Sequence, residues 1–169
     1  MKLNDIDAFV FDFDGVITDN LVYLDQYGKE MVSCSRADGL AFDVLNQLNK
    51  PVYILSTEQN PVVTERANKL KITALQNIKD KVSALDDLSN KYGYDVSKIY
   101  YVGNDLNDYK VMQYCGYTAC PSDSHSAIKE IADIVLVAKG GNGVVRELLE
   151  NHFKINFIKI LYTEEGVKK

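Results

Sequence analysis

FVFDFDGVITDN, residues 9–20, carries an apolar run straight into two aspartates and a glycine. Side chains at positions i and i+2 of an extended strand point to the same face. Asp12 and Asp14 are therefore predicted to project together from the end of a strand, while Phe13 turns towards the core. Because ligands bind outside the carboxyl ends of the strands in open α/β sheets, this segment predicts both the fold class and the place of the site.

Two carboxylates this close need a compensating cation. At a separation of ~5 Å and an effective dielectric constant of ~20, Asp12 and Asp14 repel each other by about 3 kcal/mol. Oxygen ligands with little else nearby favour a hard ion such as Mg²⁺ over metals bound by thiolate or imidazole. A calcium EF-hand is excluded, because the glycine comes fourth from the first aspartate instead of sixth and an apolar strand precedes the motif.

Short β-rich apolar segments alternate with helical patterns along the rest of the chain. The predicted strands cover residues 8–11, 52–55, 72–75, 99–102, 117–120 and 133–137. This alternation is typical of a Rossmann-like three-layer α/β sandwich, with a central parallel sheet and helices on both faces. At 169 residues the chain fits a single domain, residues 1–169, with one compact core.

Helix signals fall between the predicted strands. Asp38 is predicted to cap a helix over residues 39–50. Asn60 and Pro61 are predicted to open the helix of residues 62–71, with the proline at the first helical position. A glycine, Gly93, is predicted to end the helix that starts at Lys81.

Residues 21–34 break the alternation, because they read as two strands around Gln26, Tyr27 and Gly28. They are interpreted as a β-hairpin that stands over the strand ends as a flap, with an extension of the main sheet as the alternative. Residues 154–169 form a tail with a short apolar run and a charged end. This tail is either a frayed terminus or an arm that packs on a neighbouring subunit.

Composition excludes several classes of partner. The net charge is −5, and the 19 Lys and Arg are spread among 24 acidic residues without a basic block, so no nucleic acid partner is expected. No apolar run approaches the ~20 residues of a membrane span. Three cysteines without CxxC spacing or a secretory leader predict a reducing cytoplasmic location.

Polar side chains follow several of the predicted strands. Ser56, Thr57 and Glu58 come after residues 52–55, Lys81 starts a helix, and the GNDLND segment follows residues 99–102. Taken singly, each has an ordinary structural explanation, such as a turn cap or a solvated surface residue. Together they supply carboxylates, metal-binding oxygens, a hydroxyl and an ammonium, which is the set of groups that phosphoryl transfer requires.

The order DxDGVxTD, Ser56, Lys81 and GNDLND resembles the haloacid dehalogenase superfamily, and nearly the whole chain takes part. The short sequence, the hairpin, SRADG (35–39) and GGNGVVRE (140–147) resemble its small phosphatases that act on phosphorylated ulosonic acids and have no separate cap domain. The resemblance implies a homotetramer, in which the flap and tail of a neighbour complete an active site at a subunit interface.

The resemblance also implies a role for each motif residue. Asp12 would be the nucleophile that forms an aspartyl-phosphate, and Asp14 the acid and base that also offers its backbone carbonyl to Mg²⁺. Ser56 and Lys81 would bind the phosphoryl oxygens. The implied metal group comprises Asp12, Asp14, Asn104, Asp105 and Asp108. Asn104 stands where the family more often has Asp, so either Asn104 or Asp105 would reach the metal, with Asp108 supporting the loop.

A further set of residues is implied to contact the sugar acid. The set comprises Ser35, Arg36, Ala37, Asp38 and Gly39 of the SRADG loop, and Glu58, Arg66 and Lys69. The last three match the pattern of nine-carbon enzymes of the sialic acid 9-phosphate type, since octulosonate enzymes tend to have Arg in place of the Glu. Arg66 and Lys69 are three apart and share a helix face, which suits a substrate carboxylate.

Three alternatives remain open at this point. One is a 3-deoxy-D-manno-octulosonate 8-phosphate phosphatase. Another is a non-catalytic tetramerisation domain associated with sialic acid activation, favoured by Asn104 in place of Asp. A receiver-like signalling domain fits poorly, because the second predicted strand ends in LSTE without an acceptor Asp.

Overall fold

The computed structural model describes residues 2–162. Its main sheet has six parallel strands in the order β5-β4-β1-β6-β7-β8. The strands are β1 (Ala8–Phe11), β4 (Val52–Leu55), β5 (Thr73–Leu75), β6 (Ile99–Val102), β7 (Tyr117–Cys120) and β8 (Ile134–Val135). Every predicted strand is present. The last is shorter than predicted because the amides of Val137 and Ala138 donate to the Glu147 carboxylate instead of to a neighbouring strand.

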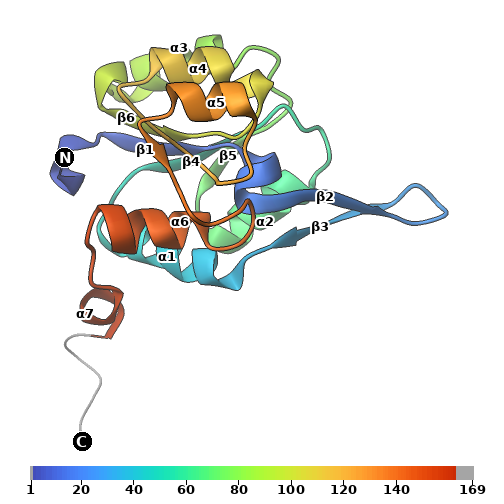
Figure 1. The fold of residues 1–169 in the computed structure, drawn as a ribbon, viewed down its shortest axis with the longest axis horizontal. Coiled ribbons are helices and arrows are strands. Elements are labelled where there is room, and N and C mark those ends of the chain that lie inside the picture. The colour runs from blue at the N-terminus through green and yellow to red at the C-terminus, as the bar shows by residue number, and fades with distance from the viewer. Residues whose placement is uncertain (1, 163–169) are drawn as a thin grey trace, which may run out of the picture.

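Helices cover both faces of this sheet, as the alternation predicted (Figure 1). On one face lie α1 (Arg36–Gln47), α2 (Val62–Leu70), α6 (Val144–Glu147) and α7 (Phe157–Tyr162). On the other lie α3 (Lys81–Tyr92), α4 (Tyr109–Tyr114) and α5 (Ser126–Ile131). Strand β1 is buried on both sides, because Phe9 and Phe11 enter one core cluster and Ala8 and Val10 enter the other. This burial explains its uninterrupted apolar run.

The helix ends require two corrections. Ser35, not Asp38, caps α1, because its Oγ accepts hydrogen bonds from the amides of Ala37 and Asp38. Asp38 lies inside the first turn. Pro61 is the N-cap of α2 and not its first helical residue. Gly93 ends α3 with a positive φ of 73°, as predicted.

The predicted hairpin is present as β2 (Thr18–Leu24) and β3 (Glu30–Cys34), which project from the body of the molecule (Figure 1). The two strands form their own antiparallel sheet, so the alternative of an extended main sheet is wrong. The Asp25 carboxylate fixes the turn by accepting the amides of Tyr27 and Lys29. Six apolar side chains of the hairpin are more than half exposed: Leu21, Val22, Tyr23, Leu24, Tyr27 and Met31.

Residues Phe157–Tyr162 form α7, whose Phe157 is buried in the core cluster that α1 also joins. The frayed-terminus prediction is therefore wrong for residues 157–162, and residues 163–169 lie outside the described part. Between residues 2 and 162, no helix has the length and apolar character needed to cross a membrane.

Candidate active site

The strand ends of β1, β4 and β6 meet at one cavity of about 330 Å³. It is lined by Asp12, Asp14, Asn20, Thr57, Asn104, Asp105, Leu106 and Asn107. The predicted convergence of the first and last motifs is therefore present in the structure. Asn20 and Asn107 were not predicted as site residues. Asn20 has a positive φ of 64°, and no sequence signal marks it as part of a site.

Lys81 lies behind Asp12 and neutralises much of the buried acidity. Its Nζ is 2.8 Å from Asp12 Oδ1 and 2.7 Å from Asp108 Oδ1, and all three side chains are at most 4% exposed. Lys81 is the first residue of α3, so the start of that helix sets its position. An ammonium has three N–H donors, and these two contacts leave one for another acceptor.

The ionisation of this group follows from its burial. Desolvation raises the pKa of Asp12 well above its ordinary value, and the charge of Asp108 adds to this effect, while Lys81 opposes it. Desolvation alone would lower the pKa of Lys81, but the carboxylates of Asp12 and Asp108 outweigh it, so the net shift is upward. Lys81 therefore stays charged, and two carboxylates share one ammonium.

Asp108 supports the loop from behind the cavity. Besides Lys81, its Oδ1 accepts the Tyr101 hydroxyl at 2.8 Å. Its Oδ2 accepts the amides of Asn104 at 2.8 Å and Asp105 at 3.4 Å. Because both oxygens already have protein donors and Asp108 does not line the cavity, it is not placed to ligate a metal directly. This placement corrects its inclusion among the metal ligands and leaves it the supporting position.

Asn104 offers an oxygen with no protein partner. Its Oδ1 is buried and accepts no hydrogen bond from any described residue. A buried acceptor left unpaired costs about 1–3 kcal/mol, which a bound cation in the cavity would relieve. Asp105 is exposed instead, and its Oδ1 already accepts the Leu106 amide at 2.7 Å. Of the two residues left open by the sequence, the geometry favours Asn104.

The available oxygens suit a hard cation. Asp12 and Asp14 line the cavity beside the unpaired oxygen of Asn104, and Mg²⁺ prefers such ligands. Within residues 2–162, no group of three or more His, Cys, Asp or Glu side chains is arranged to hold a metal ion. A site made here would therefore depend on the amide of Asn104 and on backbone or water oxygens in addition to carboxylates.

Ser56 and Thr57 directly follow β4. Ser56 is fully buried, and its Oγ accepts the Glu58 amide at 3.1 Å, which leaves the hydroxyl hydrogen to donate. Thr57 lines the cavity itself. Thr57 was not predicted as a site residue, although it directly follows Ser56 in the sequence.

Asp14 is placed to carry a proton. Burial raises its pKa, the nearby charge of Glu58 raises it further, and a hydrogen bond with Thr18 lowers it in part. A carboxyl group with a raised pKa holds its proton nearer to neutral pH, which suits a general acid.

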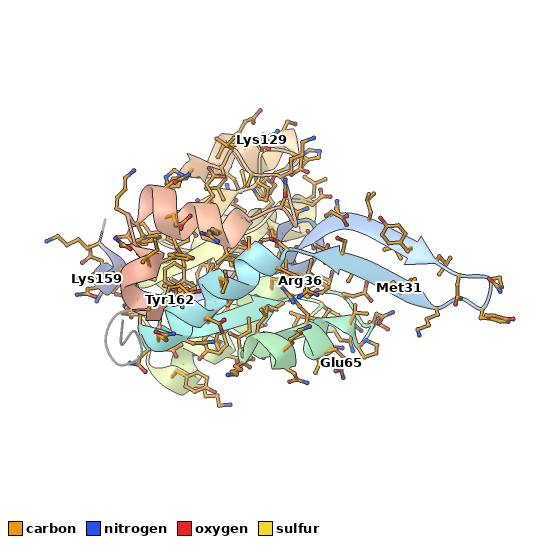
Figure 2. The ribbon with its side chains drawn as sticks, turned by 90° about the horizontal axis from the view of Figure 1, so that it is seen from below. Met31, Arg36, Glu65, Lys129, Lys159 and Tyr162 are labelled. Carbon is orange, nitrogen blue, oxygen red and sulfur yellow. The ribbon has the colours of Figure 1, made fainter. Side chains whose placement is uncertain are left out.

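A second cavity, of about 400 Å³, lies between α1 and α2 at the base of the hairpin and is lined by cationic side chains. Arg36, Arg66 and Lys69 all line it, together with Gly39 of the SRADG loop. The guanidinium of Arg66 donates to the Ser35 carbonyl at 2.8 Å, which fixes its direction. Figure 2 shows Arg36 at the start of α1, next to the base of the hairpin.

Four residues predicted to contact substrate do not line this cavity: Ser35, Ala37, Asp38 and Glu58. Asp38 is 1% exposed, and its Oδ1 accepts the Arg146 amide at 2.9 Å, so it faces α6. Ala37 lines a different cavity with Arg146. Glu58 Oε1 accepts amides of its own loop, those of Gln59 and Asn60. The sequence placed these residues near the site but could not give their direction.

Comparison with known proteins adds independent findings. A family model described as haloacid dehalogenase-like hydrolase matches residues 40–148. The 3-deoxy-D-manno-octulosonate 8-phosphate phosphatase of Escherichia coli strain K12 is 31% identical over 150 residues, covering 88% of this chain and 80% of that protein.

Solved structures agree with the sequence matches. A haloacid dehalogenase family hydrolase from Streptomyces avermitilis has a TM-score of 0.86 and 40% identity, covering 89% of this chain and 86% of that one. The 3-deoxy-D-manno-octulosonate 8-phosphate phosphatase of Moraxella catarrhalis, solved in complex with magnesium, phosphate and KDO, has a TM-score of 0.83 and 29% identity over 89% and 90% of the two chains. Motifs, fold and relatives agree, and the chain belongs to the haloacid dehalogenase-like hydrolases.

Proposed function

We propose that this protein is a Mg²⁺-dependent phosphatase that removes the terminal phosphate of a 2-keto-3-deoxy sugar acid. The observation that carries the proposal is the buried Asp12–Lys81 pair at 2.8 Å, beside a cavity that also contains Asp14 and the unpaired oxygen of Asn104. Family membership and the phosphatase activity of the relatives support the same reaction class.

Asp12 is the proposed nucleophile. Its Oδ1 is held by Lys81 at 2.8 Å and by the Phe13 amide at 2.7 Å. No described residue donates to its Oδ2, which remains available to attack phosphorus. The attack forms an aspartyl-phosphate and breaks the bond between phosphorus and the sugar oxygen.

Asp14 is the proposed acid and base. Its proton passes to the departing sugar alkoxide, and its carboxylate then takes a proton from the water that attacks the aspartyl-phosphate. This second attack releases inorganic phosphate and restores Asp12. The third N–H of Lys81 and the hydroxyl of Ser56 are the donors proposed for the phosphoryl oxygens.

Asp12, Asp14 and Asn104 would hold the metal ion. When bound, Mg²⁺ supplies positive charge that stabilises the phosphoryl oxygens in the transition state. The neutral amide of Asn104 lowers the negative charge of this set by one compared with an aspartate at the same position.

The cavity lined by Arg36, Arg66 and Lys69 is the proposed site for the carboxylate of the sugar acid. We favour a nine-carbon acid of the KDN or N-acylneuraminate 9-phosphate type, because Glu58, Arg66 and Lys69 match that pattern in the sequence. The eight-carbon substrate named for the relatives is the second candidate.

The exposed apolar residues of the hairpin, including Leu24 and Tyr27, support assembly into a homotetramer with active sites at subunit interfaces. Three cysteines without disulfide bonds, Cys34, Cys115 and Cys120, fit a cytoplasmic location.

The test is steady-state hydrolysis of nine-carbon 9-phosphates and of the eight-carbon 8-phosphate, with Mg²⁺ and with EDTA. We expect Mg²⁺-dependent release of phosphate, loss of activity in Asp12→Asn, and a higher kcat/KM for the nine-carbon ester. Wild-type activity in Asp12→Asn would refute the mechanism. A tetramer that neither turns over these esters nor binds Mg²⁺ in a calorimetric titration would support the non-catalytic alternative.

A further inference from the structure

Residues 140–143, here called the glycine segment, have no role in the proposed reaction. They pack directly on the turn that follows β1. A Cβ atom on Gly140 would lie 2.3 Å from the carbonyl oxygen of Gly15, and one on Gly141 would lie 2.5 Å from the amide nitrogen of Asp19. The Gly141 amide also donates to the Val16 carbonyl at 3.0 Å. Only residues without a side chain permit so close an approach of two backbones.

One carboxylate binds the glycine segment itself, and a second binds α6, the helix that directly follows it. Asp123 Oδ1 accepts the Gly140 amide at 3.0 Å. Asp38 Oδ1 accepts the amide of Arg146, just beyond the other end of the segment, at 2.9 Å. Asp38 comes from α1 and is 1% exposed, so it contacts neither solvent nor the cavity that contains Asp12.

The turn after β1 also contacts the predicted metal ligand. A Cβ atom on Gly15 would lie 1.9 Å from Asn104 Nδ2. The glycine segment, the Gly15 turn and Asn104 therefore form three layers in direct contact. Movement of the glycine segment would let this turn, which begins at Asp14, move away from Asn104.

We propose that Asp38 is a positioning residue, which holds the glycine segment against the Gly15 turn and so keeps Asp14 and Asn104 at their working separation. This inference rests on the roles given to those two residues under the proposed function. Asp38 acts through its hydrogen-bond acceptor and not through its charge, and it does not touch the substrate. The prediction contrasts with the sugar-acid contact expected from its place in SRADG.

Asp38→Ala and Asp38→Asn test the proposal with two substrates, a nine-carbon 9-phosphate and p-nitrophenyl phosphate, which has no sugar acid. In Asp38→Ala we expect kcat to fall about tenfold on both substrates, with KM changed less than about twofold, because misplaced catalytic groups slow chemistry on any ester. Asp38→Asn retains an acceptor oxygen, so kcat should stay within about threefold of wild type. Asp87→Ala, an exposed aspartate on α3, is the matched control.

Wild-type kcat in Asp38→Ala would overturn the proposal. A loss confined to the sugar-acid ester, or an equal loss in Asp38→Asn, would also overturn it, because either result indicates a substrate contact or a required charge. If Asp38→Ala does not fold, Asp123→Ala is measured instead, because Asp123 is exposed. We expect kcat to fall on both substrates in this variant. An unchanged kcat would contradict the proposal.

The two substrates separate this inference from the proposed function. If the wild type hydrolyses only p-nitrophenyl phosphate, the sugar-acid assignment fails, and Asp38 is still judged on that ester. If the wild type hydrolyses neither, both proposals fail.

Discussion

Replacing Lys81 with methionine, a side chain of similar length without charge, removes the only cation in contact with Asp12 and Asp108 within the described residues. Both carboxylates would remain buried, at 4% and 0% exposure. Breaking a buried ion pair by removing one partner destabilises a protein by about 3–5 kcal/mol. For a chain of this size, that corresponds to a fall in Tm of roughly 6–20 °C.

The loss of stability in Lys81→Met should depend on pH. Burial already raises the pKa of Asp12, so the folded state binds its proton more tightly than the unfolded state does. That contribution to stability is present below the ordinary pKa of an aspartate and is lost as the pH rises through the raised value. Without Lys81 the pKa rises further, so Lys81→Met should be destabilised more at pH 8 than at pH 5.

Urea unfolding of metal-free protein at both pH values measures this difference. Lys98→Met, which removes an exposed lysine ahead of β6, is the matched control and should change stability by less than about 0.5 kcal/mol. A loss below about 1 kcal/mol at pH 8, or the same loss at both pH values, would refute the view that Lys81 compensates two buried carboxylates.

Three further outcomes are expected. Gly15→Ala places a Cβ 1.9 Å from Asn104 Nδ2 at a positive φ of 79°. The free energy of unfolding of this variant, measured in urea, should be lower by at least about 2 kcal/mol, and most of its phosphatase activity should be lost. Arg66→Met should raise KM for the sugar-acid ester about tenfold or more and leave KM for p-nitrophenyl phosphate unchanged. If the variant and the wild type have the same KM for the sugar-acid ester, Arg66 does not contact the substrate carboxylate. Leu24→Glu, on the exposed apolar part of the hairpin, should lower the oligomeric state measured by analytical ultracentrifugation, and an unaltered sedimentation coefficient would remove the hairpin from the interface.

Several features were predictable because their causes are local in sequence. Runs such as residues 8–11 and 99–102 are apolar throughout, as required of strands covered on both faces. The hairpin was predictable from turn residues between two β-rich stretches, and the stop of α3 from Gly93. The presence of polar groups at one edge followed from parallel strands, whose carboxyl ends meet.

Directions of several side chains were not predictable, because partners distant in the chain set them. Asp38 was expected to cap a helix or contact substrate, yet it binds an amide 108 positions later in the chain. Asp108 was grouped with the metal ligands, yet Lys81 and Tyr101 occupy one of its oxygens.

The sequence by itself determined the succession of the main-sheet strands along the chain, the first three helices and the chemical groups at the site, because periodicity, turn residues and motif spacing act over short stretches. Only the tertiary structure decided which oxygens are already paired and which, like Asn104 Oδ1, remain without a partner among the described residues. Hydrogen bonding of a buried group depends on every segment packed around it, and that information exists only once the chain has folded.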